Sequence, residues 1–138
     1  MGPLPMLAPP APISVLLTWE PASARDLSRI RDGLLRRFPT DPDLRERMEL
    51  VATELSGNAL RHGTPPVVVR LLRADDCYIL DVADGATDRA PAPADGHRDV
   101  QAGGRGLPIV QSLARQVAWY ATGSAKHVWA SFPVRTPQ

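Results

Sequence analysis

The sequence predicts an α+β domain, a two-layer sandwich in which helices pack on one face of a mostly antiparallel mixed sheet. Three observations support this fold class. Strand-like and amphipathic helical segments alternate in the order strand, helix, helix, hairpin, loop, helix and strands. The two runs of the central hairpin are joined by a connection that is short and polar enough for antiparallel pairing. The chain has 138 residues, which suits one domain of common size with a real core.

The first segments are an N-terminal tail, a strand and a helix. Residues 1–12 are rich in proline, so we expect a flexible tail before a domain that spans residues 13–138. Ile13–Trp19 is β-branched and apolar, which is typical of a strand. From Ala22 to Phe38, apolar residues recur at steps of three and four among arginines, which predicts an amphipathic surface helix.

A second helix and a hairpin follow. Thr40 or Asp41 can cap a helix that has Pro42 in its first turn and continues to His62. Val67–Leu72 and Tyr78–Ala83 then alternate like the two strands of a hairpin.

The last third of the chain begins with an aperiodic stretch between Ala86 and Gly103, which is longer than most loops of compact domains. A lid or binding loop is the reason we expect for its length. Gly106–Val117 has helical periodicity, and strands are expected around Ala118–Ala121 and at Val128–Phe132.

Composition excludes several classes of function. With 16 Lys and Arg against 15 Asp and Glu, the net charge is +1, so we expect no direct nucleic-acid partner. The N-terminus lacks a positively charged signal region, and no apolar run approaches the ~18 residues of a membrane span. Cys77 is the one cysteine, which indicates a reducing compartment, and a cytoplasmic location is the expectation.

Two polar residues of the second helix suggest a site. Glu54 and Asn58 lie four residues apart, so they share one helical face. Because Mg²⁺ keeps several waters and is held by only one or two protein oxygens plus phosphates, the Asn58 carbonyl is a reasonable ligand. The nearby carboxylate could orient or deprotonate a nucleophile. Equally, both residues could lie on a solvated helix side, with Glu54 paired to Arg47 or Arg61.

Glycines mark two further candidate positions. Gly104-Arg105-Gly106 precedes a helix, where backbone amides and the helix N-terminus can bind a phosphate, although an ordinary turn has the same composition. Asp84-Gly85 ends a strand, where the carboxylate could accept a hydrogen bond from an exocyclic amine, or where the pair could only form a turn. The three histidines lack zinc-site spacing, and His127 is expected to be a strand residue.

In this order the motifs resemble those of the GHKL superfamily of ATPases and kinases, in particular its small anti-sigma-factor serine kinase branch. The segment from Glu54 to His62 is similar to the N box, Asp84-Gly85 to the G1 box, and the segment from Gly104 to Val110 to the G2 box. The segment from Gly123 to His127 lacks the Gly-Thr pair often seen in larger relatives. The resemblance covers roughly Ile13 to Val134 and implies the Bergerat fold, with ATP between the N-box helix, the sheet and a lid.

The resemblance also implies roles for individual residues. Asn58 would bind Mg²⁺, Glu54 would be the general base, and Asp84 would read adenine. The remaining ATP-binding residues that it implies are Arg61, His62, Gly85, Gly104, Arg105, Gly106 and Leu107.

Two functions from different classes follow from the resemblance. The first is an ATP-dependent serine/threonine protein kinase that acts as an anti-sigma factor and phosphorylates an anti-anti-sigma partner. The second is a non-catalytic module that sequesters a sigma factor or another partner, with or without ATP. The presence of both Glu54 and Asn58 favours the kinase, because a pure binder has no use for a general base. Similar proteins often form homodimers.

Overall fold

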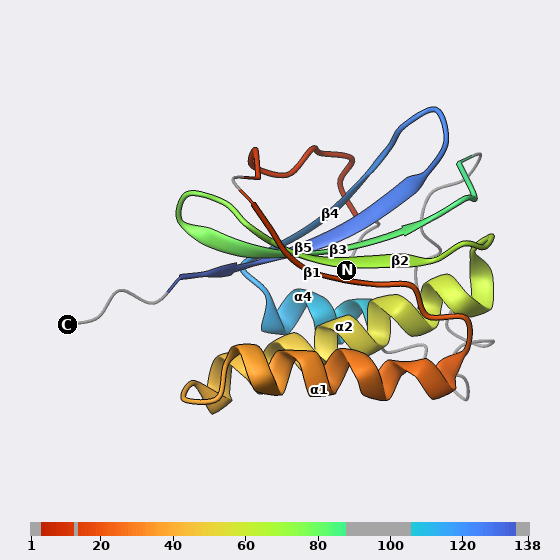
Figure 1. Ribbon diagram of the computed structural model, residues 1–138. Helices are drawn as coiled ribbons and strands as arrows, with labels where there is room; N and C mark the ends of the chain where they lie inside the picture. The colour runs from red at the N-terminus through yellow and green to blue at the C-terminus, as the bar shows by residue number, and fades with distance from the viewer. Residues whose placement is uncertain (1–3, 13, 88–105, 135–138) are drawn as a thin grey trace.

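The computed structural model describes residues 4–12, 14–87 and 106–134. A five-stranded sheet in the order β1-β2-β3-β5-β4 forms one layer, and helices α1, α2 and α4 cover one of its faces (Figure 1). All four neighbouring strand pairs are antiparallel. The predicted α+β sandwich is therefore confirmed. The strands are β1 (Ser14–Trp19), β2 (Val68–Arg73), β3 (Cys77–Asp84), β4 (Gln116–Ala121) and β5 (Lys126–Pro133), and the helices are η1 (Ala24–Asp26), α1 (Leu27–Arg37), α2 (Pro42–His62) and α4 (Gly106–Leu113).

Helix α2 begins where its capping residue predicts. Asp41 caps α2, since its carboxylate accepts a hydrogen bond from the Leu44 N–H at 3.3 Å, and Pro42 is the first helical residue, as expected. The first helical segment starts later than its pattern predicts. The Asp26 carboxylate accepts the Ala22 N–H at 2.9 Å, and a short 3₁₀ turn precedes α1.

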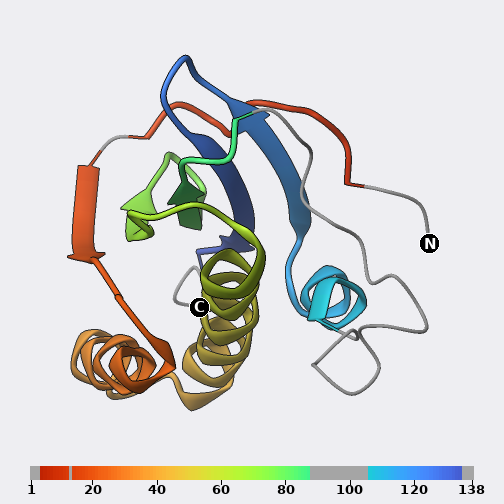
Figure 2. The same ribbon diagram turned by 90° about the vertical axis from the view of Figure 1, so that its right-hand side faces the viewer.

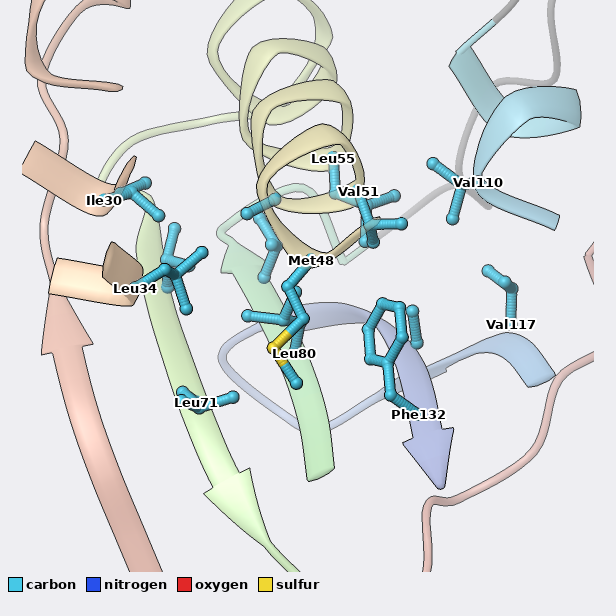
Figure 3. Close-up of a cluster of buried hydrophobic side chains, with 14 of the residues drawn as sticks. Ile30, Leu34, Met48, Val51, Leu55, Leu71, Leu80, Val110, Val117 and Phe132 are labelled. Carbon is cyan, nitrogen blue, oxygen red and sulfur yellow. The ribbon is translucent and has the colours of Figure 1, made fainter. Parts of the chain in front are cut away.

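The core lies between the sheet and the helices (Figure 3). Helix α2 packs between α1 and α4 and contacts β3, and it places Met48, Val51 and Leu55 against the sheet. The buried stripe of this helix follows the three- and four-residue spacing of its apolar positions. Because α2 is fixed along its length, the side chains at its C-terminal end have a defined position over the sheet.

A second boundary prediction, the end of the last helix, is also wrong. Helix α4 ends at Leu113, and Val117, expected as its last apolar position, belongs to β4 and pairs with Ala130 of β5. A short apolar run fits both the helical and the strand period. Pairing with β5 makes Val117 a strand residue rather than a helical one. The pairing begins at the Arg115 N–H, which donates to the Ser131 carbonyl at 2.8 Å. Of the proposed lid, Ala86–Gly103, the part from residue 88 onward lies outside the described residues.

The N-terminal segment also differs from the expected flexible tail of residues 1–12. The Leu7 N–H donates to the Trp119 carbonyl at 2.9 Å, and the Trp119 N–H donates to the Pro5 carbonyl at 3.1 Å. The segment therefore adds a short parallel bridge to the outer edge of β4, and it crosses the side of the sheet away from the helices (Figure 2). The indole N–H of Trp129 donates to the Leu7 carbonyl at 2.8 Å. An edge strand offers unpaired backbone groups, and composition alone does not reveal that a nearby segment satisfies them.

Candidate functional site

A buried ion pair joins the ends of β3 and β5 on the helix side of the sheet. Asp84 and Lys126 are partners in the strand register, and the Lys126 Nζ lies 3.6 Å from the Asp84 Oδ2. The two side chains are only 4% and 7% exposed. Buried charges are costly without partners, so the ammonium and the carboxylate each offset the charge of the other. The pair places one positive and one negative group at this end of the sheet.

Backbone groups hold the Asp84 carboxylate from its other side. Its Oδ1 accepts the Ala86 N–H at 2.7 Å and the Thr64 N–H at 3.4 Å. The Gly85 N–H donates to the Thr64 carbonyl at 2.7 Å, so the end of β3 is tied to the connection that leaves α2. Asp84-Gly85 thus forms a turn, and Asp84 is at the same time a buried acceptor.

Gly63 makes this approach possible. A Cβ atom at this position would lie 2.5 Å from the Asp84 Cγ and 2.7 Å from the Ala59 carbonyl oxygen, closer than nonbonded atoms approach. The glycine that ends α2 is therefore required by the carboxylate beside it rather than by an unusual backbone conformation, because the φ of Gly63 is −89°.

A pocket with a cavity of about 30 Å³ opens beside the ion pair, between α2, the start of α4 and strands β3 and β5. Its walls are mostly apolar, and four polar side chains converge on it. The lining residues are Leu55, Asn58, Ala59, His62, Val82, Asp84, Leu107, Lys126 and Val128. The structure thus brings together Asn58, His62, Asp84 and Leu107, four of the residues proposed from the sequence.

Asn58 is half-buried at the pocket wall. Its Oδ1, the atom that would bind a metal, accepts a hydrogen bond from the Arg61 guanidinium at 2.9 Å. Arg61 itself is exposed and does not line the pocket. A cation bound at the second lone pair of this oxygen would lie close to the Arg61 guanidinium, and the two positive charges would repel each other.

The other proposed residues are placed less fully. Glu54 lies one turn before Asn58 on α2 and is half-buried, but it is not part of the pocket lining. Gly106 is the first residue of α4, whereas Gly104 and Arg105 lie outside the described residues. The roles proposed for these residues remain predictions.

Lys126 lines the pocket, although no sequence motif pointed to it. A signal was present, because the alternation of β5 puts position 126 on the same face as the apolar Val128 and Ala130. A lysine on a core-facing strand position needs a partner, and Asp84 opposite it in the register is that partner.

A second acid–base pair lies on the opposite face of the same two strands. The His127 Nδ1 is 2.9 Å from the Asp81 Oδ2, and both residues are buried. The Tyr120 ring stacks on the imidazole with 4.5 Å between ring centroids and 6° between planes. Burial and the negative charge of Asp81 raise the pKa of the Tyr120 hydroxyl. His127 is a strand residue, as expected from the sequence.

Comparison with known families gives one match. The model of the histidine kinase-like ATPase domain matches residues 17–132, which is most of the chain. No curated protein matches the chain significantly. Within the described residues, no helix combines the length and apolar character that crossing a bilayer requires.

Proposed function

The chain belongs to the family of histidine kinase-like ATPase domains, which implies that it binds a nucleotide, and we propose that it is a serine/threonine protein kinase. In this proposal it acts as an anti-sigma factor and transfers phosphate to an anti-anti-sigma partner. The observation that carries the proposal is the convergence of Asn58, Asp84 and Lys126 on one pocket at the end of α2.

The lining of the pocket suits a purine base, because its walls are mostly apolar with a few fixed polar groups, as in most small-molecule sites. The cavity of about 30 Å³ is smaller than a base, so the walls would move apart when the base enters. Asp84 is held by backbone N–H groups at Oδ1, while its Oδ2 faces Lys126. A carboxylate oxygen has more than one lone pair, so Oδ2 can still accept from an amine of the base.

The helix side of the pocket suits a magnesium ion. Mg²⁺ prefers hard oxygen ligands and is commonly held by one protein oxygen with waters and phosphates. Asn58 supplies such an oxygen, and Arg61 would turn away from it when the cation binds. The released guanidinium would then be available to the phosphates.

Transfer to a hydroxyl needs few groups from the protein. When bound, Mg-ATP supplies the phosphoryl group and the charge neutralisation. The Glu54 carboxylate, one turn from Asn58, would accept the proton of the serine or threonine hydroxyl. Asn58 and Asp84 position the nucleotide at either end of the pocket.

One observation favours a second candidate, a module that sequesters a sigma factor without catalysis. The Asn58 oxygen is already engaged by Arg61, and Glu54 does not line the pocket. If these contacts persist with nucleotide present, the chain binds ATP and has no arrangement for transfer.

Calorimetric titration with ATP, with and without Mg²⁺, separates these functions when it is combined with two variants. We expect magnesium-dependent binding that Asn58→Ala removes. Glu54→Gln, which keeps shape and removes the base, should bind Mg-ATP normally but lose transfer from radiolabelled ATP to anti-anti-sigma proteins. Binding without transfer by the unchanged protein would support the sequestration module, and loss of binding in Glu54→Gln would contradict the role given to that residue.

A further inference from the structure

We propose that Lys126 reads the nucleotide base together with Asp84: its ammonium donates a hydrogen bond to ring nitrogen N1 of adenine, while Asp84 accepts from the 6-amino group. This assignment rests on the nucleotide binding described above and names the residues that select the base.

The first argument is the hydrogen-bonding capacity of Lys126. An ammonium group has three N–H donors and no acceptor. In the described part of the chain its ion-pair partner is Asp84, at 3.6 Å, and the side chain is only 7% exposed. Because Lys126 also lines the pocket, the N–H donors that do not face Asp84 are available to a ligand that brings an acceptor to this end of the pocket.

The second argument is the order of the groups along the pocket wall. Asp84 presents an acceptor and Lys126 presents a donor, and both line the pocket from neighbouring strands. A 6-aminopurine has the complementary edge, because its amino donor lies next to N1, which is an acceptor. Guanine reverses this order, since its 6-oxo oxygen would face the Asp84 carboxylate and its N1–H would face the ammonium.

A purely structural role explains the pair less well. The antiparallel pairing of β3 and β5 already holds the two strands together, with register partners that run from Cys77 and Pro133 to Asp84 and Lys126. Apolar residues in place of a buried ion pair often leave stability unchanged or raise it. A charged pair whose side chains border an open pocket is instead suited to a ligand.

Three nucleotides test the assignment on the unchanged protein. In 1-deaza-ATP a C–H group replaces N1, and in 7-deaza-ATP the change lies on the other ring, so it serves as the matched control. We expect 1-deaza-ATP to bind at least about tenfold more weakly than ATP, as for loss of a hydrogen bond to a charged group. We expect 7-deaza-ATP to bind like ATP. Equal affinity for ATP and 1-deaza-ATP overturns the proposal while leaving nucleotide binding intact, and failure of all three to bind overturns both.

Variants then assign the discrimination to Lys126. Lys126→Met keeps the length of the side chain and removes its donors, so ATP and 1-deaza-ATP should bind it with equal, reduced affinity. Lys126→Arg retains N–H donors and should keep part of the preference for ATP. An unchanged preference in Lys126→Met would show that another group contacts N1, which contradicts the proposal. Should Lys126→Met not fold, the comparison of 1-deaza-ATP with 7-deaza-ATP on the unchanged protein remains decisive.

Discussion

Two buried acid–base pairs bridge β3 and β5, and they face opposite sides of the sheet. Asp84 and Lys126 lie on the helix side and border the pocket. Asp81 and His127 lie on the other side, where the Tyr120 ring covers the imidazole. Lys126 and His127 are consecutive in the sequence, so the alternation of one strand assigns neighbouring residues to different environments. The comparison indicates that the site is defined by the face of the sheet rather than by proximity in the chain.

The pairs also differ in how they tolerate the loss of a partner. A lysine in a buried position is left as an unpaired charge when its carboxylate is removed. An imidazole can instead release its proton near neutral pH and remain as a neutral ring. Loss of the acidic partner should therefore cost more on the helix side.

The largest expected effect comes from Asp84→Ala. It leaves Lys126 without its ion-pair partner and the Ala86 N–H without its acceptor, so the free energy of unfolding should fall by about 3–5 kcal/mol. Urea denaturation followed by circular dichroism measures this loss. The double variant Asp84→Ala with Lys126→Met should recover much of it, and failure to recover any would show that the charge of Lys126 is not the cause.

Gly63→Ala sharpens the comparison by disturbing one pair only. The added methyl group would meet the Asp84 carboxylate and the Ala59 carbonyl, so we expect a loss of about 1–3 kcal/mol, as for other overpacked sites. Gly123→Ala is the matched control, because a Cβ there has no neighbour within 4 Å. Thermal unfolding of the two variants provides the measurement. Equal melting temperatures would contradict the close approach of Gly63 to Asp84.

Asp81→Ala probes the pair on the opposite face. It removes a hydrogen-bond partner from an imidazole rather than the ion-pair partner of an ammonium, so the loss should be smaller than for Asp84→Ala, about 1–2 kcal/mol for a buried hydrogen bond. Nucleotide affinity should stay as in the unchanged protein, since Asp81 does not line the pocket. A loss of stability as large as that of Asp84→Ala would contradict the expectation that a buried lysine depends more on its carboxylate than a buried histidine does.

The smallest effect is expected at the exposed pair of Arg115 and Asp76, which are 3.2 Å apart. The hydrogen bond from Arg115 lowers the pKa of the Asp76 carboxyl, so the pair stabilises the fold at neutral pH and ceases to do so as the pH falls below about 4. Arg115→Ala should change the urea midpoint only slightly at pH 7, and the difference should vanish in acid. A difference that grows in acid would contradict this direction.

Much of the fold follows from patterns in the sequence. The capping Asp41, the apolar stripe of α2 and the hairpin of β2 and β3 depend on local chemistry, and the structure confirms each of them. Val117 was assigned to the wrong element because its spacing satisfies two periods until β5 pairs with it. The N-terminal segment depends on an edge strand distant in the sequence, which no local pattern specifies.

The residues of the candidate site that belong to a sequence motif could be predicted. Those that reach the site only through the pairing of two strands could not. Asn58 and Asp84 belong to recognisable motifs, and both line the pocket. Lys126 becomes significant only through its register with Asp84, and the hydrogen bond from Arg61 to Asn58 depends on side-chain orientation. Both require knowledge of the tertiary structure.

The most direct test of the central claim is calorimetric titration of ATP into Asp84→Asn and Asp81→Asn, two variants with the same chemical change on opposite faces of β3. Circular dichroism first establishes that both are folded. We predict that Asp84→Asn loses most of its affinity for ATP and that Asp81→Asn binds like the unchanged protein. Equal affinity in the two folded variants would contradict the placement of the nucleotide site on the helix side of the sheet.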